Sequence, residues 1–322
     1  MILFAKIISR AVDTFGLNRI ANVRMAVNPA CFALQLGSYR SRDEHSQTSG
    51  LPFIKRRNTM QALKFVRNGL VACAALLATL SPATKATAQT QPPSGVKTVL
   101  LVHGAWADGS SWSKVIPLLE AKGLHVVAVQ IPLTSFADDV AATERAIALE
   151  DGPVLLVGHS YGGAVITEAG NDPKVAGLVF VSAVAPDKGE STLGLISSVA
   201  TPIGSELRPD KNGFLKLTPK GVAEDFAQDL SAKEIAVLAA TQVPVNVTAM
   251  KGEVTIPAWK TKPSWYIVAG NDRAISPDLE AAQAKRIGAT TTTVSSSHVI
   301  MLSQPAKVAT VILDAASKAV SK

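Results

Sequence analysis

The chain has only two cysteines in 322 residues, Cys31 and Cys73, and both lie in its first quarter. From residue 89 to the C-terminus there is no cysteine at all. A disulfide, a catalytic thiolate and a cysteine-ligated metal site all depend on cysteine side chains. The sequence therefore excludes these three features from that part of the chain.

The body of the chain also lacks the excess of basic residues that the whole chain shows. The formal net charge is +7, but residues 1–88 hold twelve Lys and Arg against three acidic residues. The residues after 88 hold twenty Lys and Arg against twenty-two acidic residues. Because the positive charge belongs to the N-terminal segment, it does not indicate a nucleic-acid-binding surface on the body. We expect no nucleic-acid partner.

The apolar stretch at residues 70–80 is too short to cross a bilayer, which needs about 20 residues. Two basic residues precede the stretch, and an Ala-Thr-Ala sequence follows it at residues 86–88. A basic start, a short apolar core and an A-x-A site are typical of a secretory signal peptide, here residues 60–88. We expect cleavage after Ala88, a periplasmic or secreted protein, and no stable membrane insertion after cleavage.

Residues 1–59 precede a signal that should begin a protein. They are basic and irregular, without the sustained apolar pattern of a folded core. We interpret them as a non-native or disordered extension, with Met60 as the true initiator. A genuine transit or regulatory extension is the alternative.

The pentapeptide GHSYG at residues 158–162 carries the strongest chemical signal in the chain. In the G-x-S-x-G spacing, a sharp turn between a strand and a helix exposes the serine hydroxyl, and the small flanking residues let the backbone close. A chance glycine-rich loop is the alternative. The apolar run at 153–157 and the helical stretch at 164–166 place the motif between a strand and a helix. This context predicts Ser160 as a nucleophile.

Apolar runs alternate with amphipathic stretches along the body of the chain. Strands are predicted near 97–103, 125–131, 153–158, 175–184, 264–270 and 290–295, and helices near 110–122, 138–150, 161–171, 277–287 and 304–319. This alternation predicts an α/β fold whose mainly parallel sheet is covered on both faces. A body of this length usually forms one domain, here residues 96–320. The alternation breaks at about 187–263, which predicts a small helical cap inserted over the active site.

Four histidines follow the predicted cleavage site, and one of them is the expected general base. His125 falls in an apolar strand, where a packed role is expected, and His159 should point away from its neighbour Ser160. His103 ends the first strand, where we expect it to order the following loop. His298 follows the last strand, at the sheet edge where α/β ligand sites gather. We therefore predict that His298 takes the proton of the nucleophile.

Asp272 follows the strand before His298 and is the predicted acid. Nucleophile, acid and base then run Ser160, Asp272, His298 along the chain, which is the order expected of a Ser-His-Asp triad on an α/β-hydrolase sheet. Asp187, after the strand that follows the nucleophile, is the rival acid, and Asp272 could instead be only a turn residue.

The loop after the first strand completes the expected site. A tetrahedral intermediate needs two N–H donors for its oxyanion, and the backbone N–H groups of Ala105 and Tyr161 are the candidates. Trp106 and Met301 are expected to contact the substrate. Trp112 could line the same pocket or belong to the core.

These motifs resemble those of the α/β-hydrolases, and more narrowly the branch of plant methylesterases and hydroxynitrile lyases. The resemblance rests on residues 102–106, 156–163 and 298–305. It implies the triad and oxyanion donors named above, with no cofactor and no metal. Val299 stands where such lyases carry a lysine directly after the catalytic histidine, so we do not expect cyanohydrin cleavage.

The sequence thus predicts a serine esterase that hydrolyses a small hydrophobic or aromatic carboxylic ester through an acyl-enzyme. A perhydrolase or a carbon–carbon bond hydrolase could use the same three residues. A ligand-binding protein that keeps the triad without turnover is the alternative from another class.

Overall fold

A computed structural model describes residues 95–319 of the chain. The expected extension at 1–59 and the expected signal peptide at 60–88 lie outside the described residues. Both stay predictions, as does the export that depends on the signal peptide. Between residues 95 and 319 no helix is both long enough and apolar enough to cross a membrane.

Six parallel strands form a central sheet in the order β2-β1-β3-β4-β8-β9. Their bounds are β1 Thr98–Val102, β2 His125–Val129, β3 Val154–His159, β4 Val175–Val181, β8 Ser264–Ala269 and β9 Thr290–Val294. Strands β3, β4 and β8 are buried along their whole length. This burial explains why their sequences are continuous apolar runs instead of alternating patterns. The predicted α/β class and its parallel sheet are confirmed.

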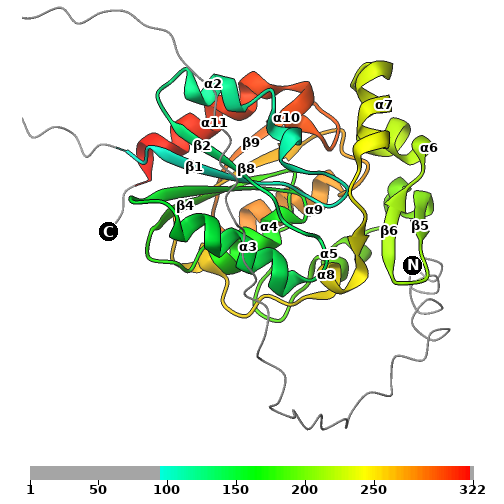
Figure 1. The fold of residues 1–322 in the computed structure, drawn as a ribbon, viewed down its shortest axis with the longest axis horizontal. Coiled ribbons are helices and arrows are strands. Elements are labelled where there is room, and N and C mark those ends of the chain that lie inside the picture. The colour runs from blue at the N-terminus through cyan, green and yellow to red at the C-terminus, as the bar shows by residue number, and fades with distance from the viewer. Residues whose placement is uncertain (1–94, 320–322) are drawn as a thin grey trace, which may run out of the picture. The chain divides into compact units, whose positions relative to one another are not determined.

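Helices cover both faces of this sheet (Figure 1). Helices α2 and α11 pack together on one face, and α3 and α4 pack together on the other. The helices outside the cap are α2 Ile116–Glu120, α3 Phe136–Ala148, α4 Gly162–Ala169, α9 Pro277–Arg286, α10 Ile300–Ser303 and α11 Pro305–Lys318. In α11 the apolar residues Val308, Ile312 and Ala315 are buried, as their helical spacing predicts.

The helix expected over residues 110–122 is divided into two short elements. A 3₁₀ helix, η1, spans Gly109–Trp112, and α2 begins at Ile116. Proline has no backbone N–H, so Pro117 cannot make the hydrogen bond that a continuous helix would need there. In the first turn of a new helix the backbone N–H groups have no partner within the helix, so a proline there breaks no hydrogen bond.

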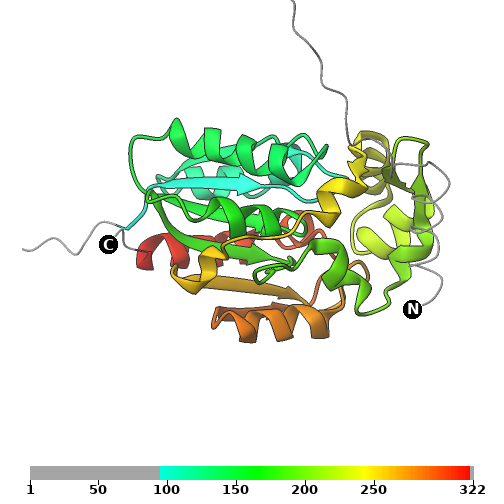
Figure 2. The same ribbon diagram turned by 90° about the horizontal axis from the view of Figure 1, so that it is seen from below.

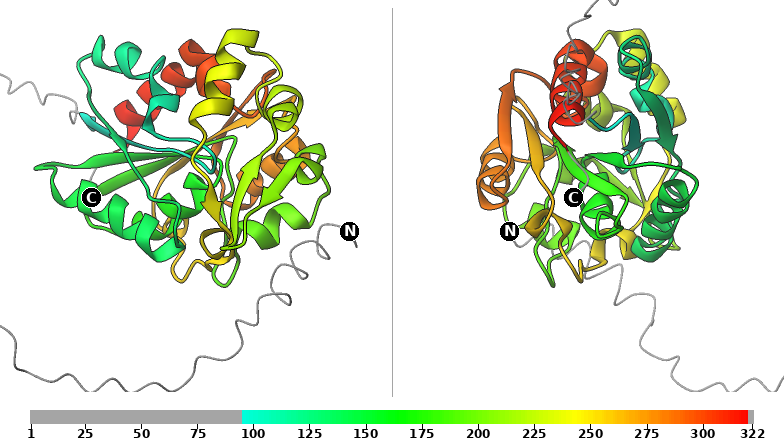
Figure 3. Two further views of the ribbon diagram at one scale, coloured as in Figure 1. Left: turned by 45° about the vertical axis from the view of Figure 1, so that its right-hand side comes forward. Right: turned by 90° about the vertical axis from the view of Figure 1, so that its left-hand side faces the viewer.

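The segment between β4 and β8 forms the cap. Its elements are α5 Thr192–Ser197, η2 Pro202–Glu206, β5 Leu207–Pro209, β6 Phe214–Leu217, α6 Pro219–Gly221, η3 Val222–Phe226, α7 Ala232–Thr241, β7 Val245–Asn246, α8 Val247–Lys251 and η4 Ala258–Lys260. The cap is not only helical, because β5, β6 and β7 pair as a small antiparallel sheet. Figure 2 shows the cap at the end of the central sheet to which the strands point, and it comes forward in the left view of Figure 3.

Candidate active site

Ser160 lies in a strained turn between β3 and α4. Its φ angle is 53°, in the left-handed region that non-glycine residues rarely adopt and that costs about 1–3 kcal/mol. Close backbone contacts explain the glycines on both sides of the serine. A Cβ atom on Gly158 would lie 2.6 Å from the carbonyl oxygen of Gly162, and a Cβ atom on Gly162 would lie 2.6 Å from that of His103. The turn that the G-x-S-x-G spacing predicts is therefore present.

His298 and Asp272 form a buried pair at the carboxyl edge of the sheet. His298 Nδ1 donates to Asp272 Oδ2 at 2.5 Å, and both side chains have no exposed surface. The other carboxylate oxygen, Oδ1, accepts the backbone N–H groups of Ala274 at 2.7 Å and Ile275 at 2.9 Å. These bonds fix the carboxylate, and the carboxylate fixes the imidazole tautomer with its proton on Nδ1.

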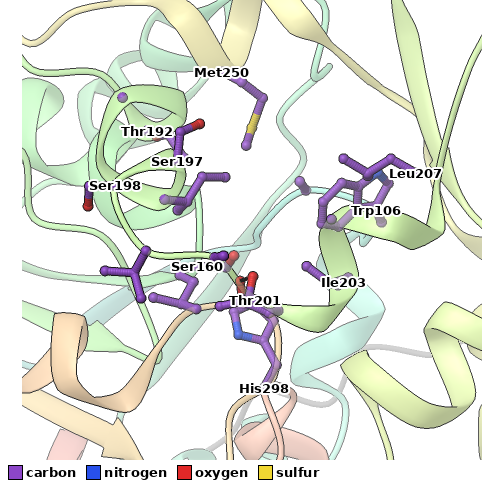
Figure 4. Close-up of a pocket in the computed structure, with 18 of the residues that line it drawn as sticks. Trp106, Ser160, Thr192, Ser197, Ser198, Thr201, Ile203, Leu207, Met250 and His298 are labelled. Carbon is purple, nitrogen blue, oxygen red and sulfur yellow. Dashed lines mark hydrogen bonds between the residues drawn. The ribbon is translucent and has the colours of Figure 1, made fainter. Parts of the chain in front are cut away.

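The second ring nitrogen of His298 is free to act as a base. Within the described part of the chain, His298 Nε2 is buried and has no hydrogen-bond partner. His298 and Ser160 line the same cavity (Figure 4). The rival acid, Asp187, instead forms an ion pair with Lys260 at 2.5 Å and is partly exposed. The structure thus brings together the three predicted residues, and their catalytic role stays a prediction.

A second buried carboxyl group lies beside Asp272. The sequence did not predict its place in the site. Glu280 in α9 is fully buried, and its Oε2 accepts the backbone N–H of Ala269 at 3.1 Å. Burial, and then the charge of Asp272, raise the pKa of Glu280 well above its ordinary value. The protonated form of Glu280 is therefore favoured more than in an exposed glutamate. In the sequence it looks like an ordinary acid in the first turn of a helix, which gives no sign of this contact.

The loop expected to supply an oxyanion donor lies against the nucleophile. A Cβ atom on Gly104 would lie 2.6 Å from the Cβ atom of Ser160, so only glycine allows this approach. The next residue, Ala105, lines the cavity together with Ser160. His103 orders the loop as expected, since its Nδ1 donates to the carbonyl of Gly104 at 2.9 Å and its Nε2 accepts the N–H of Ile131 at 3.2 Å. Burial lowers the pKa of His103 and keeps it neutral.

Tyr161, the other expected oxyanion donor, is held by a buried carboxylate. Its hydroxyl donates to Asp139 Oδ2 at 2.6 Å, and Asp139 Oδ1 accepts the N–H of Leu133 at 2.7 Å. Burial raises the pKa of Asp139 to about 6, although both hydrogen bonds act in the opposite direction. Asp139 therefore fixes the side chain of the residue whose backbone N–H is expected to bind the oxyanion.

The structure agrees with the expectation for His159 and disagrees with the expectation for His125. His159 points away from the cavity as expected, and its Nε2 donates to the carbonyl oxygen of His298 at 3.0 Å. His159 thereby supports the backbone of the predicted base. This contact was not predicted from the sequence. The packed role expected for His125 is wrong. This residue begins the edge strand β2, where 61% of its side chain is exposed and its Nε2 lies 3.4 Å from Glu150.

The cavity has a volume of about 610 Å³, and the cap supplies most of its lining (Figure 4). It is lined by Ala105, Trp106, Ser160, Thr192, Gly194, Ile196, Ser197, Ser198, Val199, Ala200, Thr201, Ile203, Gly204, Ser205, Leu207, Met250, Ala274, Ile275 and His298. No Lys, Arg, Asp or Glu of the described chain belongs to this lining. The site can therefore enclose an uncharged apolar molecule next to Ser160, with hydroxyl groups on part of its wall.

The two residues expected to contact the substrate behave differently. Trp106 lines the cavity as expected, and its Nε1 donates to the carbonyl of Leu215 in the cap at 3.0 Å. The expectation for Met301 is wrong. Met301 is fully buried in the short helix α10, which packs against η1 and turns the methionine into the core. Met250 of α8 lines the cavity instead. Trp112 is fully buried and does not line the cavity, so it belongs to the core.

Between residues 95 and 319 no group of three or more His, Cys, Asp or Glu side chains is arranged to hold a metal ion.

Comparisons with known proteins identify the family of this chain. A model described as "Alpha/beta hydrolase family" matches residues 99–311. Methylesterase 8 of Arabidopsis thaliana is 30% identical over 210 residues, which cover 56% of this chain and 74% of that protein. Salicylic acid-binding protein 2 of Nicotiana tabacum is 25% identical over 264 residues, which cover 69% of this chain and 98% of that protein.

Solved structures share the fold at lower identity. A pyrethroid hydrolase from Sphingobium faniae JZ-2 has a TM-score of 0.62 at 22% identity, over 69% of this chain and 98% of that one. Polyneuridine aldehyde esterase has a TM-score of 0.61 at 22% identity, over 68% of this chain and 98% of that one.

Proposed function

The chain belongs to the alpha/beta hydrolase family, and we propose that it is a serine esterase that hydrolyses carboxylic esters through Ser160, His298 and Asp272. One observation carries the proposal. A buried histidine, oriented by a buried carboxylate, presents a nitrogen without a partner among the described residues, in the cavity that also holds a serine in a strained turn. This is the arrangement that nucleophilic acyl transfer requires.

The proposed reaction has two half-reactions. Ser160 Oγ attacks the ester carbonyl while His298 Nε2 accepts its proton, and the oxyanion accepts hydrogen bonds from the N–H groups of Ala105 and Tyr161. His298 then gives the proton to the departing alcohol, which leaves an acyl group on Ser160. In the second half, His298 activates water, the water attacks the acyl carbon, and the serine hydroxyl is restored with release of the acid. The carboxylate of Asp272 stabilises the imidazolium in both halves.

We propose a small hydrophobic or aromatic ester as the substrate. The cavity is lined by apolar and hydroxyl-bearing side chains and, within the described structure, by no acidic or basic residue other than His298. A charged substituent would lose its hydration there without gaining a partner of opposite charge. The relatives named above as esterases and hydrolases act in the same reaction class.

A simple hydrolysis assay tests the proposal. The purified protein should release nitrophenol from short-chain nitrophenyl esters, and Ser160→Ala should abolish the release. Ser110→Ala is the matched control, because Ser110 is an exposed serine of η1 that does not line the cavity. A wild-type protein that hydrolyses no carboxylic ester would contradict the proposed function.

We also propose that the protein is exported, on the strength of the signal sequence at residues 60–88. N-terminal sequencing of the exported protein should find Gln89 as the first residue. A cytoplasmic protein with an intact leader would contradict this proposal.

A further inference from the structure

One turn of the cap contacts both loops that carry the proposed acid and base. This cap turn, residues 225–229, begins at the end of the π-helix η3 and leads toward α7. None of its residues lines the cavity. The turn therefore does not face an enclosed substrate directly, although the ring of Phe226 packs edge-to-face on the cavity residue Trp106. Turns with π-helical geometry are frequently found at functional sites.

The first set of contacts reaches the residues on both sides of Asp272. Arg273 Nε donates to Asp225 Oδ1 at 2.8 Å, and the side chain of Asp225 is only 3% exposed. Gln228 Nε2 donates to the carbonyl oxygen of Asn271 at 2.7 Å. The cap turn thus holds the residue before the proposed acid through its backbone and the residue after it through an ion pair.

The second set of contacts reaches His298 and the residues before it. Asp229 Oδ2 accepts the backbone N–H of Ser297 at 2.8 Å and the hydroxyl of Ser296 at 3.2 Å. The buried ring of Phe226 packs on the imidazole of His298, with ring centroids 5.1 Å apart and planes tilted by 49°. Ser297 is itself buried, so its backbone N–H depends on this carboxylate for a partner.

We propose that the cap turn is a positioning element of the catalytic site, which holds the acid loop and the histidine loop at a fixed separation. The loops follow different strands, β8 and β9. Besides the bond between His298 and Asp272, direct bonds between the loops run from Asn271 to Ser295 and Ser296. The cap turn belongs to neither loop and contacts both of them. Because a displacement of about 1 Å in a catalytic group can cost about 100-fold in rate, such a support acts on the chemical step.

This inference rests on the proposed esterase function, and it separates two roles of the cap. Residues 192–207 line the cavity, so changes there should act mainly on KM. The cap turn does not line the cavity, so loosening it should lower kcat and leave KM nearly unchanged. A turn that merely anchored the cap would give the opposite pattern, because a loosened cap loses substrate affinity.

Asp229 offers the sharpest test, since both of its bonds to the histidine loop end on one oxygen atom. Asp229→Ala removes both bonds, and the residue is exposed, so no buried cavity is left. Asp229→Asn keeps an amide oxygen that can accept both. We expect kcat about tenfold lower in Asp229→Ala, KM within about twofold of wild type, and near wild-type kcat in Asp229→Asn.

Thr248→Val is the matched control. Thr248 Oγ1, in α8, donates to the carbonyl of Thr134 at 2.9 Å, which is also a bond from the cap to the core but lies away from both loops. Its loss should leave kcat unchanged. A wild-type kcat in Asp229→Ala, an equal fall in Thr248→Val, or a higher KM at unchanged kcat would each overturn the inference.

Hydrogen exchange gives a readout that does not depend on ester hydrolysis. In Asp229→Ala the amides of residues 296–298 should exchange faster than in wild type, while Asp229→Asn and Thr248→Val should keep wild-type rates. Unchanged exchange at residues 296–298 in Asp229→Ala would overturn the positioning role. Absence of esterase activity in the wild-type protein would instead contradict the proposed function.

Discussion

The buried carboxyl group of Asp139 should make the stability of the protein depend on pH in a direction opposite to that of most carboxylates. Asp139 is fully buried, and its pKa is raised by burial to about 6 in the folded protein. In the unfolded chain its pKa returns to about 3.8. The folded protein therefore keeps the proton over a range of pH in which the unfolded chain has lost it.

The sign and size of the effect follow from these two values. As the pH rises through this range, ionisation favours the unfolded chain, so the contribution of Asp139 to stability falls until the pH passes about 6. The pKa difference corresponds to about 3 kcal/mol in the free energy of unfolding, of which about 2–3 kcal/mol is lost between pH 4 and pH 7.

Asp139→Asn removes this titration. The asparagine has one carbonyl oxygen for two donors, the Tyr161 hydroxyl and the Leu133 N–H, so it carries a cost of about 1–3 kcal/mol that does not depend on pH. The free energy of unfolding of the variant, relative to wild type, should therefore rise by about 2–3 kcal/mol from pH 4 to pH 7. Urea unfolding followed by tryptophan fluorescence at each pH measures the difference.

The neighbouring carboxyl group is a matched control. Asp138 is exposed, and hydrogen bonds from Ser135 and Thr134 lower its pKa. Its stabilisation is complete above the unfolded pKa and is lost only as the pH falls below it, so Asp138→Asn should be less stable than wild type by a constant amount across pH 4 to 7. Parallel pH profiles for wild type and Asp139→Asn would refute the raised pKa of Asp139.

Three further predictions concern the site itself. Asp272→Asn should lower kcat by about 10³–10⁴-fold, because asparagine cannot stabilise the imidazolium, whereas Asp187→Asn, in its exposed ion pair, should keep wild-type kcat in the same ester assay. Glu280→Gln should fold and retain most activity, since burial favours the uncharged form of the native side chain. Glu280→Ala should lose about 1–3 kcal/mol in urea unfolding because the N–H of Ala269 loses its partner. Ile203→Asp should raise KM for an apolar ester by about tenfold or more, and Ile203→Leu should not, because only the first places a charge in the cavity.

The sheet and the residues at its edge could be predicted from the sequence because their signals are local. A parallel strand covered on both faces is a continuous apolar run, so the strand ends, and with them Ser160, Asp272 and His298, can be located from the runs themselves. The order of these three residues along the chain then predicts which of them should meet.

The contacts that the sequence did not reveal join residues far apart in the chain. Asp229 and Ser297 are 68 positions apart, and nothing in either neighbourhood marks them as partners. The same holds for Asp139 and the Tyr161 hydroxyl. The strands of the cap, two to four residues long, are too short to show an alternating pattern.

The wrong expectation for Met301 has a related cause. Proximity to His298 in the chain suggested a place in the cavity, but α10 has only four residues and no apolar periodicity that could show which way its side chains point. Its packing against η1, almost two hundred positions earlier in the chain, decides the orientation.

Covalent labelling with a fluorophosphonate probe, followed by mass spectrometry of the labelled peptide, tests the central claim most directly. The reagent reacts with a serine whose hydroxyl is activated by a neighbouring base. We predict about one label per chain, on Ser160, and none on Ser160→Ala or His298→Ala. No labelling of the folded wild-type protein, or labelling that persists in Ser160→Ala, would contradict the claim that Ser160 is an activated nucleophile.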